Sequence, residues 1–198
     1  MPAANTVELD SHAVATLRYI RASMESAASL AVPGSTGLVA GAIGVLAAIV
    51  CSVPAWRPHW LIIWLLAAGL AGAVGAALLL RQSSLSSLTM GGAPIRRFVI
   101  GLSPSLFAGA VMTWVLWANA GPRLIPGTWL LLYGCGLIAA SAATTRAIGI
   151  LGGSFVVLGL LALVARQDMQ ILMLGIGFGG LHFVFGYVMG RAGHGREG

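Results

Sequence analysis

Residues 61–80 read LIIWLLAAGLAGAVGAALLL, twenty consecutive residues without a charged side chain. A helix needs about 20 apolar residues to cross the hydrocarbon core of a bilayer, which is about 30 Å thick. A helix also satisfies its own backbone hydrogen bonds, as any lipid-exposed segment must. The stretch therefore predicts a transmembrane helix, which we expect to cover residues 58–80.

Five further stretches have the same character, and together they predict six transmembrane helices. The expected spans are 35–53, 58–80, 98–118, 128–144, 147–165 and 170–190. Only Thr144, Thr145 and Arg146 separate the fourth span from the fifth. A single helix over 128–165 would run to about 57 Å, almost twice the bilayer core, so we expect a tight hairpin there.

The composition supports a membrane protein of the all-α class. Of 198 residues, 58% are hydrophobic and only 8% are charged, and the mean hydropathy is +0.93. Soluble domains carry about a quarter charged residues. We expect one six-span bundle at 35–190, flanked by cytoplasmic segments at 1–34 and 191–198.

Arginine placement predicts the orientation. The net charge is +6, and the chain contains no lysine. With the N-terminus in the cytoplasm, the inner segments carry eight arginines and the outer loops carry three, which obeys the positive-inside rule. The inner ones are Arg18, Arg21, Arg81, Arg96, Arg97, Arg146, Arg191 and Arg196, and the outer ones are Arg57, Arg123 and Arg166. Because these charges are dispersed between apolar stretches, nucleic acid is not an expected partner.

The six tryptophans support the same orientation, with both termini in the cytoplasm. Indole side chains prefer the membrane interface, and on this topology all of them map to the outer interface. They are Trp56, Trp60, Trp64, Trp114, Trp117 and Trp129. The expected location is a cell membrane, either the inner or the plasma membrane.

Residues 14–31 precede the first span and have the periodicity of an amphipathic helix. Apolar residues from Val14 to Ala31 recur at helical spacing on one arc, while Arg18 and several serines lie on the other side. Ser11 is a suitable N-cap, and Pro33 with Gly34 ends the helix. We expect this helix to lie on the inner leaflet or to dock under the bundle.

Glycines at helical spacing indicate how the spans pack. Gly37 and Gly41 form one small-residue pair, and Gly69, Gly72 and Gly75 are expected to serve similarly. In the last span, one face contains Gly175, Gly179, His182, Gly186 and Gly190. Such stripes let helix backbones approach closely in lipid, so we expect them at helix–helix interfaces.

His182 is the only readily titratable side chain deep in a predicted span. Residue counting places Ser105, Ser141 and Ser154 at a similar depth, and Pro104 is expected to bend the third span. These residues could form an intramembrane polar layer. His182 then has two interpretations: a hydrogen bond that holds the glycine face, or a contact to a proton or solute.

Several kinds of chemistry lack the residues that they need. No Asp, Glu, Lys or Arg lies in the core of a predicted span, and the other three histidines are near the surface. Catalytic carboxylate pairs and bis-histidine haem ligation are therefore unsupported, and no metal or cofactor is expected. Cys51 and Cys135 lie in spans, where we expect free thiols.

Two functions remain open from the sequence. The first is a non-enzymatic accessory, scaffolding or regulatory component that acts through helix packing, with the lipid bilayer and other membrane proteins as partners. The second is a small transporter or channel for a neutral or weakly charged solute, using His182 and the nearby serines. An enzyme would require a serine and His182 at hydrogen-bond distance.

Overall fold

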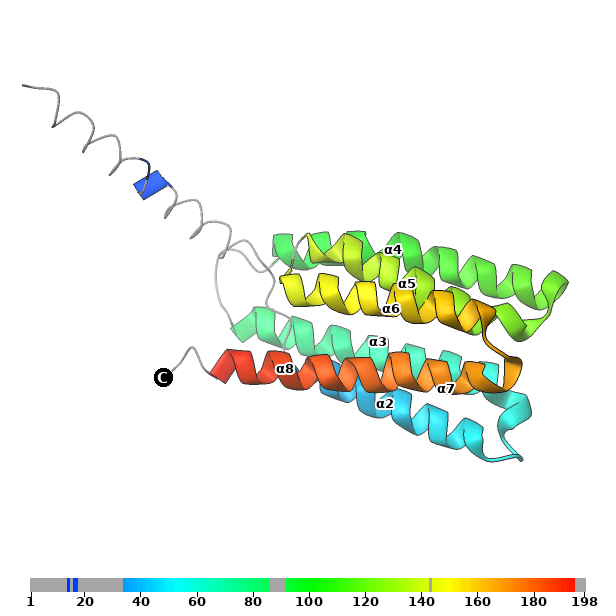
Figure 1. The fold of residues 1–198 in the computed structure, drawn as a ribbon. Helices are drawn as coiled ribbons and strands as arrows, with labels where there is room; N and C mark the ends of the chain where they lie inside the picture. Colours follow the sequence, from blue (N-terminus) through cyan, green and yellow to red (C-terminus); the bar gives the residue numbers. More distant parts are fainter. Residues whose placement is uncertain (1–13, 15, 18–33, 86–91, 143, 195–198) are drawn as a thin grey trace, which may run out of the picture.

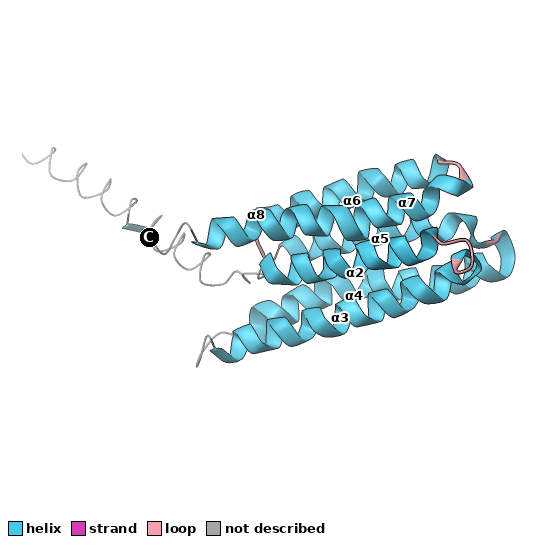
Figure 2. Cartoon of the chain, turned by 90° about the horizontal axis from the view of Figure 1, so that it is seen from below, coloured by secondary structure: helices cyan, strands magenta, loops and turns pink. Residues whose placement is uncertain are grey.

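A computed structural model describes residues 14, 16–17, 34–85, 92–142 and 144–194, and every regular element in them is helical (Figure 2). Six helices are long and apolar enough to cross a membrane, which confirms the predicted number of spans. They cover Gly34–Ser52, Arg57–Arg81, Arg96–Asn119, Pro122–Ser141, Arg146–Val164 and Gln167–Arg191. The expected amphipathic helix at 14–31 lies outside the described residues, apart from helical residues 14, 16 and 17.

The chain forms a succession of long helices joined by short turns. The long helices are α2 (Gly34–Ser52), α3 (Trp60–Leu85), α4 (Gly92–Val115), α5 (Ile125–Ser141) and α6 (Arg146–Val164). The last span combines α7 (Gln170–Leu174), a π-helical segment η5 (Gly175–Leu181) and α8 (His182–His194). A second π-helical segment, η2 (Leu116–Ala120), extends α4. Three short 3₁₀ turns precede other helices, and they are η1 (Arg57–His59), η3 (Pro122–Leu124) and η4 (Gln167–Met169).

The fourth and fifth spans are separate helices. The α5 helix ends at Ser141, and α6 begins at Arg146 after Thr145, whose backbone is extended. The amide of Thr144 donates to the carbonyl of Ser141 at 3.1 Å. The start of α5 lies earlier than the expected residue 128, because Pro126 can occupy a first helical turn, where its missing N–H is not needed.

The helices form two groups of three (Figure 1). One group contains α4, α5 and α6, and the other contains α2, α3 and the continuous α7–η5–α8 helix. Contacts of α5 with α7 and of α6 with η5 join the two groups. Successive long helices run in opposite directions, as expected for a chain that crosses a bilayer repeatedly.

The closest contact within the second group is a glycine seam between α2 and the last span. A Cβ atom on Gly37 would lie 2.8 Å from the Cα of Gly186, and one on Gly41 would lie 2.9 Å from the carbonyl oxygen of Gly179. Distances below 3.0 Å leave no room for a methyl group. The two backbones are therefore in direct contact, which is the packing that small residues permit in lipid.

A second glycine seam joins α5 to α6 in the first group. A Cβ on Gly134 would lie 2.6 Å from the carbonyl oxygen of Gly152, and a Cβ on Gly152 would lie 2.8 Å from that of Gly134. By contrast, a Cβ on Gly69 or Gly72 of α3 would meet nothing within 4 Å. The expectation that these two glycines pack against another helix is wrong.

Gly186→Ala should lower the free energy of unfolding by about 1–3 kcal/mol, because its methyl group would overpack the seam. A Cβ at this position would lie 2.5 Å from the amide nitrogen of Leu38. Gly180→Ala in the same span is a matched control, since a Cβ there meets nothing within 4 Å. Thermal unfolding in detergent measures both, and equal stability of the two variants would contradict the packing described.

Candidate functional site

His182 and Tyr133 form a hydrogen-bonded pair that joins the two helix groups. His182 is the first residue of α8, and Tyr133 lies in the middle of α5. The Tyr133 hydroxyl oxygen lies 2.9 Å from Nε2 of His182, at hydrogen-bond distance. His182 is 8% exposed. The bond therefore supplies a partner for a polar side chain that has no access to bulk water.

Aromatic rings surround this pair. The His182 ring stacks on Phe178 with an interplanar angle of 14°, and the Phe155 ring meets it edge-on with centroids 5.2 Å apart. Tyr133 packs edge-on against Phe155, with centroids 5.0 Å apart. Trp64 of α3 extends the cluster through Phe178. The result is a neutral aromatic layer at the junction of α3, α5, α6 and the last span.

Two buried polar atoms of this region have no hydrogen-bond partner in the described structure. They are Nε1 of Trp64 and Oγ1 of Thr36. An unpaired buried polar atom costs about 1–3 kcal/mol. Both residues line the same cavity. Because each of these atoms is itself buried, neither faces the open space of the cavity.

This cavity, which we call the α3–α4 cavity, has a volume of about 760 Å³. Its wall includes residues of all six spans, among them Trp64, Tyr133 and His182, and no Asp, Glu, Lys or Arg among its described lining residues. Leu65 of α3 and Leu106 of α4 line it while remaining 49% and 50% exposed. The cavity is therefore open sideways between α3 and α4.

The α3–α4 cavity is long as well as apolar. Its lining extends from Trp64 to Leu80 on α3 and from Phe98 to Thr113 on α4. At 1.5 Å per residue these stretches correspond to about 24 Å and 22 Å. The cavity thus covers most of the depth of a hydrocarbon core of about 30 Å.

Of the serines expected beside His182, only Ser105 lines the same cavity. Ser141 donates to the carbonyl of Ile138 at 2.6 Å in its own helix. It lies eight residues beyond Tyr133, or about 12 Å farther along α5. Its distance along the helix explains why the expected depth match fails.

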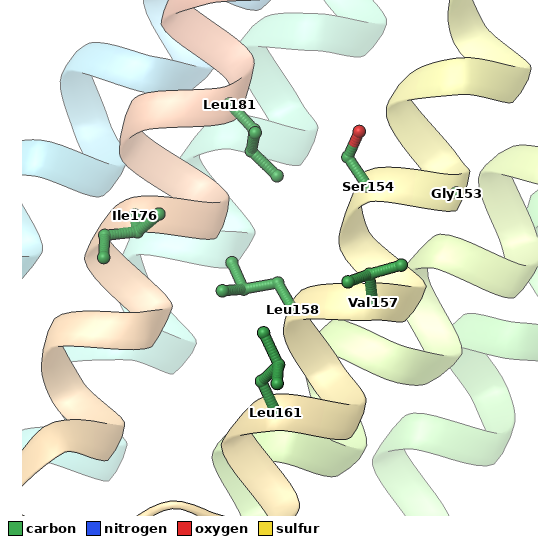
Figure 3. Close-up of a pocket in the computed structure, with 7 residues that line it drawn as sticks. All are labelled: Gly153, Ser154, Val157, Leu158, Leu161, Ile176 and Leu181. Atoms are coloured by element: carbon green, nitrogen blue, oxygen red, sulfur yellow. The ribbon is translucent and has the colours of Figure 1, made fainter.

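Ser154 lies in a different place from the α3–α4 cavity. It lines a shallow hollow of about 490 Å³ between α6 and the last span, with Leu158 and Leu181 (Figure 3). Its hydroxyl donates to the carbonyl of Ile150 at 3.0 Å. Neither Ser141 nor Ser154 is therefore joined to His182 in a polar layer.

Pro104 lies within α4, which continues through it. A proline lacks the N–H that would bond to the carbonyl four residues earlier, here Ile100. The Ser103 hydroxyl donates to this carbonyl at 3.4 Å. The adjacent serine thus partly replaces the missing backbone bond, and Ser103 itself lines the cavity.

The glycine face expected around His182 lies against α2 in the structure. Gly179 and Gly186 contact α2, and a Cβ on Gly175 would lie 2.9 Å from the Cβ of Ala48. A Cβ on Gly190 would meet nothing within 4 Å, but the backbone of Gly190 lies against Gly34 of α2, where a Cβ would be 2.5 Å from the Gly190 amide nitrogen. The His182 side chain instead reaches Tyr133 on α5. Gly175, Gly179 and Gly186 therefore keep one face across the π-helical segment η5, while the His182 side chain points to α5.

Sequence reasoning missed two residues of the site. Tyr133 lies within an apolar span as its only phenol, and that isolated hydroxyl was the available signal. Trp64 was expected at the outer interface, yet it is 3% exposed inside the bundle. It lies one helical turn below Trp60, which pairs with Trp129. Residue type did not predict that the Trp64 side chain points into the bundle.

The described residues contain no group of three or more His, Cys, Asp or Glu that could hold a metal ion. In the same part of the chain, the hydrogen-bond partner of His182 is a tyrosine rather than a serine. Comparison of the chain with protein-family models, curated proteins and solved structures gives no match.

Tyr133→Phe should lower the free energy of unfolding by about 1 kcal/mol, the usual value of a side-chain hydrogen bond between membrane helices. Tyr187→Phe is the matched control, because Tyr187 is 52% exposed and should change stability by less than about 0.5 kcal/mol. Denaturant unfolding in mixed micelles compares the two variants. Equal effects would show that the Tyr133–His182 bond contributes nothing specific.

Proposed function

We propose that this protein is a non-enzymatic membrane component that binds a largely apolar molecule of the bilayer in the α3–α4 cavity. The observation that carries the proposal is the cavity of about 760 Å³, which is open between α3 and α4 and extends to His182. Ligand sites are typically concave and mostly apolar, with a few polar groups that fix orientation. The α3–α4 cavity has this character.

The side opening favours a ligand that arrives from lipid rather than from water. Leu65 and Leu106 line the opening and are about half exposed. An apolar cavity is a poor site for water, since a bound water needs two to four polar partners. A hydrocarbon group would fill the same space with van der Waals contacts. We therefore infer that the ligand partitions into the bilayer first.

The polar groups of the cavity favour a ligand whose buried part is uncharged. The described lining contains hydroxyls such as Ser105, together with the Tyr133–His182 pair, and no charged side chain. Burying a charge without a partner is strongly unfavourable. This agrees with the expectation of a neutral or weakly charged solute, with Ser105 as the serine nearest to that role.

A second candidate function is the accessory role through helix packing. It is favoured by α3, which packs mainly against α2. Only 6% of the most apolar part of this span is buried inside the protein. A helix with so much free apolar surface could contact a helix of another membrane protein. In this alternative, α3 is the contact surface and the cavity is a consequence of loose packing.

We also propose that both termini face the cytoplasm and that the membrane is the cell membrane. Arg57, Arg123 and Arg166 follow α2, α4 and α6 in the turns at one end of the bundle, and the more numerous arginines belong to the other end. Green fluorescent protein fused to the C-terminus should then fluoresce in a bacterial host. Activity of an alkaline phosphatase fused at the same point would contradict this orientation.

Gly72→Leu should block ligand binding, because Gly72 lines the cavity and a Cβ there meets no other atom within 4 Å. The leucine can therefore fill the cavity without overpacking the protein. Gly69→Leu is the control, since Gly69 has equal space on the same helix but does not line the cavity. The probe is a long-chain alcohol carrying a diazirine, photo-crosslinked in phosphatidylcholine nanodiscs and mapped by mass spectrometry.

For the wild-type protein and Gly69→Leu, we expect saturable crosslinking to cavity-lining peptides of α3 and α4. Gly72→Leu should reduce this labelling at least about fourfold, because losing the apolar contact of a single methylene group costs about 0.8 kcal/mol. Labelling that is unsaturable and spread equally over all spans would contradict the proposed function. An unchanged signal for Gly72→Leu would contradict it as well.

A further inference from the structure

The shape of the α3–α4 cavity suits a hydrocarbon chain. The cavity has a volume of about 760 Å³ and is long, apolar and open between α3 and α4. An extended hydrocarbon chain fills such a space with van der Waals contacts.

The depth of the cavity indicates a long chain. One leaflet accounts for about 15 Å of the hydrocarbon core, half of its total thickness. The lining from Trp64 to Leu80 corresponds to about 24 Å. A chain that fills the cavity must therefore reach past the middle of the bilayer, beyond the Tyr133–His182 pair.

Arginines lie immediately beyond one end of the cavity. The lining ends at Leu80 on α3 and begins at Phe98 on α4. The neighbouring residues are Arg81 on α3 and the pair Arg96–Arg97 on α4, all of them exposed. An apolar channel with three cations at its mouth has the charge and shape for an amphiphile with an anionic head.

No acidic side chain neutralises these arginines within the described residues. Asp168 is the only acidic residue there. It pairs with Arg166 at 3.3 Å, in the turn between α6 and α7. That turn is at the opposite end of the bundle (Figure 1). Arg81, Arg96 and Arg97 can thus provide guanidinium groups to a phosphate, which arginine binds in a bidentate manner.

We propose that the occupant of the α3–α4 cavity is a lipid with one long hydrocarbon chain and a phosphate head group. The chain lies in the cavity, and the phosphate is bound by Arg81, Arg96 and Arg97. This inference rests on the proposed function, because it assigns a chemical class to the ligand of the same cavity. It also assigns a binding role to the arginine pair, beyond anchoring α4 at the interface.

The test is competition against the diazirine alcohol in phosphatidylcholine nanodiscs. The competitors are lysophosphatidic acid, a monoacylglycerol with the same chain, and inorganic phosphate. For the wild-type protein, lysophosphatidic acid should displace the probe at a much lower mole fraction than the monoacylglycerol. Inorganic phosphate should not displace it, because it lacks the chain.

Arg96→Gln with Arg97→Gln should raise the required mole fraction of lysophosphatidic acid about 25-fold, at about fivefold for each arginine near an anionic group. Displacement by the monoacylglycerol should be unchanged, which also shows that the double variant is folded. Arg57→Gln with Arg123→Gln removes two arginines from the opposite end and should leave both values as in the wild type. The advantage of lysophosphatidic acid should also decrease with added salt.

The outcomes separate this inference from the proposed function. Equal displacement by lysophosphatidic acid and the monoacylglycerol would overturn the phosphate assignment and leave the cavity as a site for an apolar molecule. Displacement by inorganic phosphate alone would overturn the lipid assignment in favour of a free anion. Failure of both lipids to displace the probe would contradict the proposed function together with this inference.

Discussion

Backbone contact at the two glycine seams is the constraint on which the rest of the structure depends. Gly37 of α2 meets Gly186 of the last span, and Gly134 of α5 meets Gly152 of α6. In lipid, helices associate through close packing rather than through exclusion of water. Each group therefore has a tightly packed pair, to which α3 and α4 are attached on one side only. The cavity is the space that remains between these two outer helices.

The Tyr133–His182 bond acts across the same junction. A histidine at this depth requires a hydrogen-bond partner, because neither lipid nor the surrounding phenyl rings can provide one. Tyr133 meets this requirement at 2.9 Å and joins α5 to α8. The Tyr133–His182 pair thus lies in the middle of the cavity, while the arginines lie at its end. This distribution suits an amphiphilic ligand better than a hydrated ion.

The sequence predicted the number of spans and the interruption near Thr144, because both depend on local length and hydropathy. It did not predict which side chains meet across helices, since depth counting contains no information about direction. Ser141 and Ser154 bond within their own helices for this reason, and Tyr133 was overlooked. Gly69 and Gly72 resemble packing glycines in the sequence alone, although no helix lies against them.

In the proposed state, the α3–α4 cavity remains open in the membrane and contains a lipid chain. Electron cryomicroscopy of the protein in nanodiscs of native lipid tests this most directly. We expect α3 and α4 to stay apart, with elongated non-protein density between them that passes Ser105 and ends near Arg81. Direct packing of α3 against α4 along their length, with no density between them, would contradict the account.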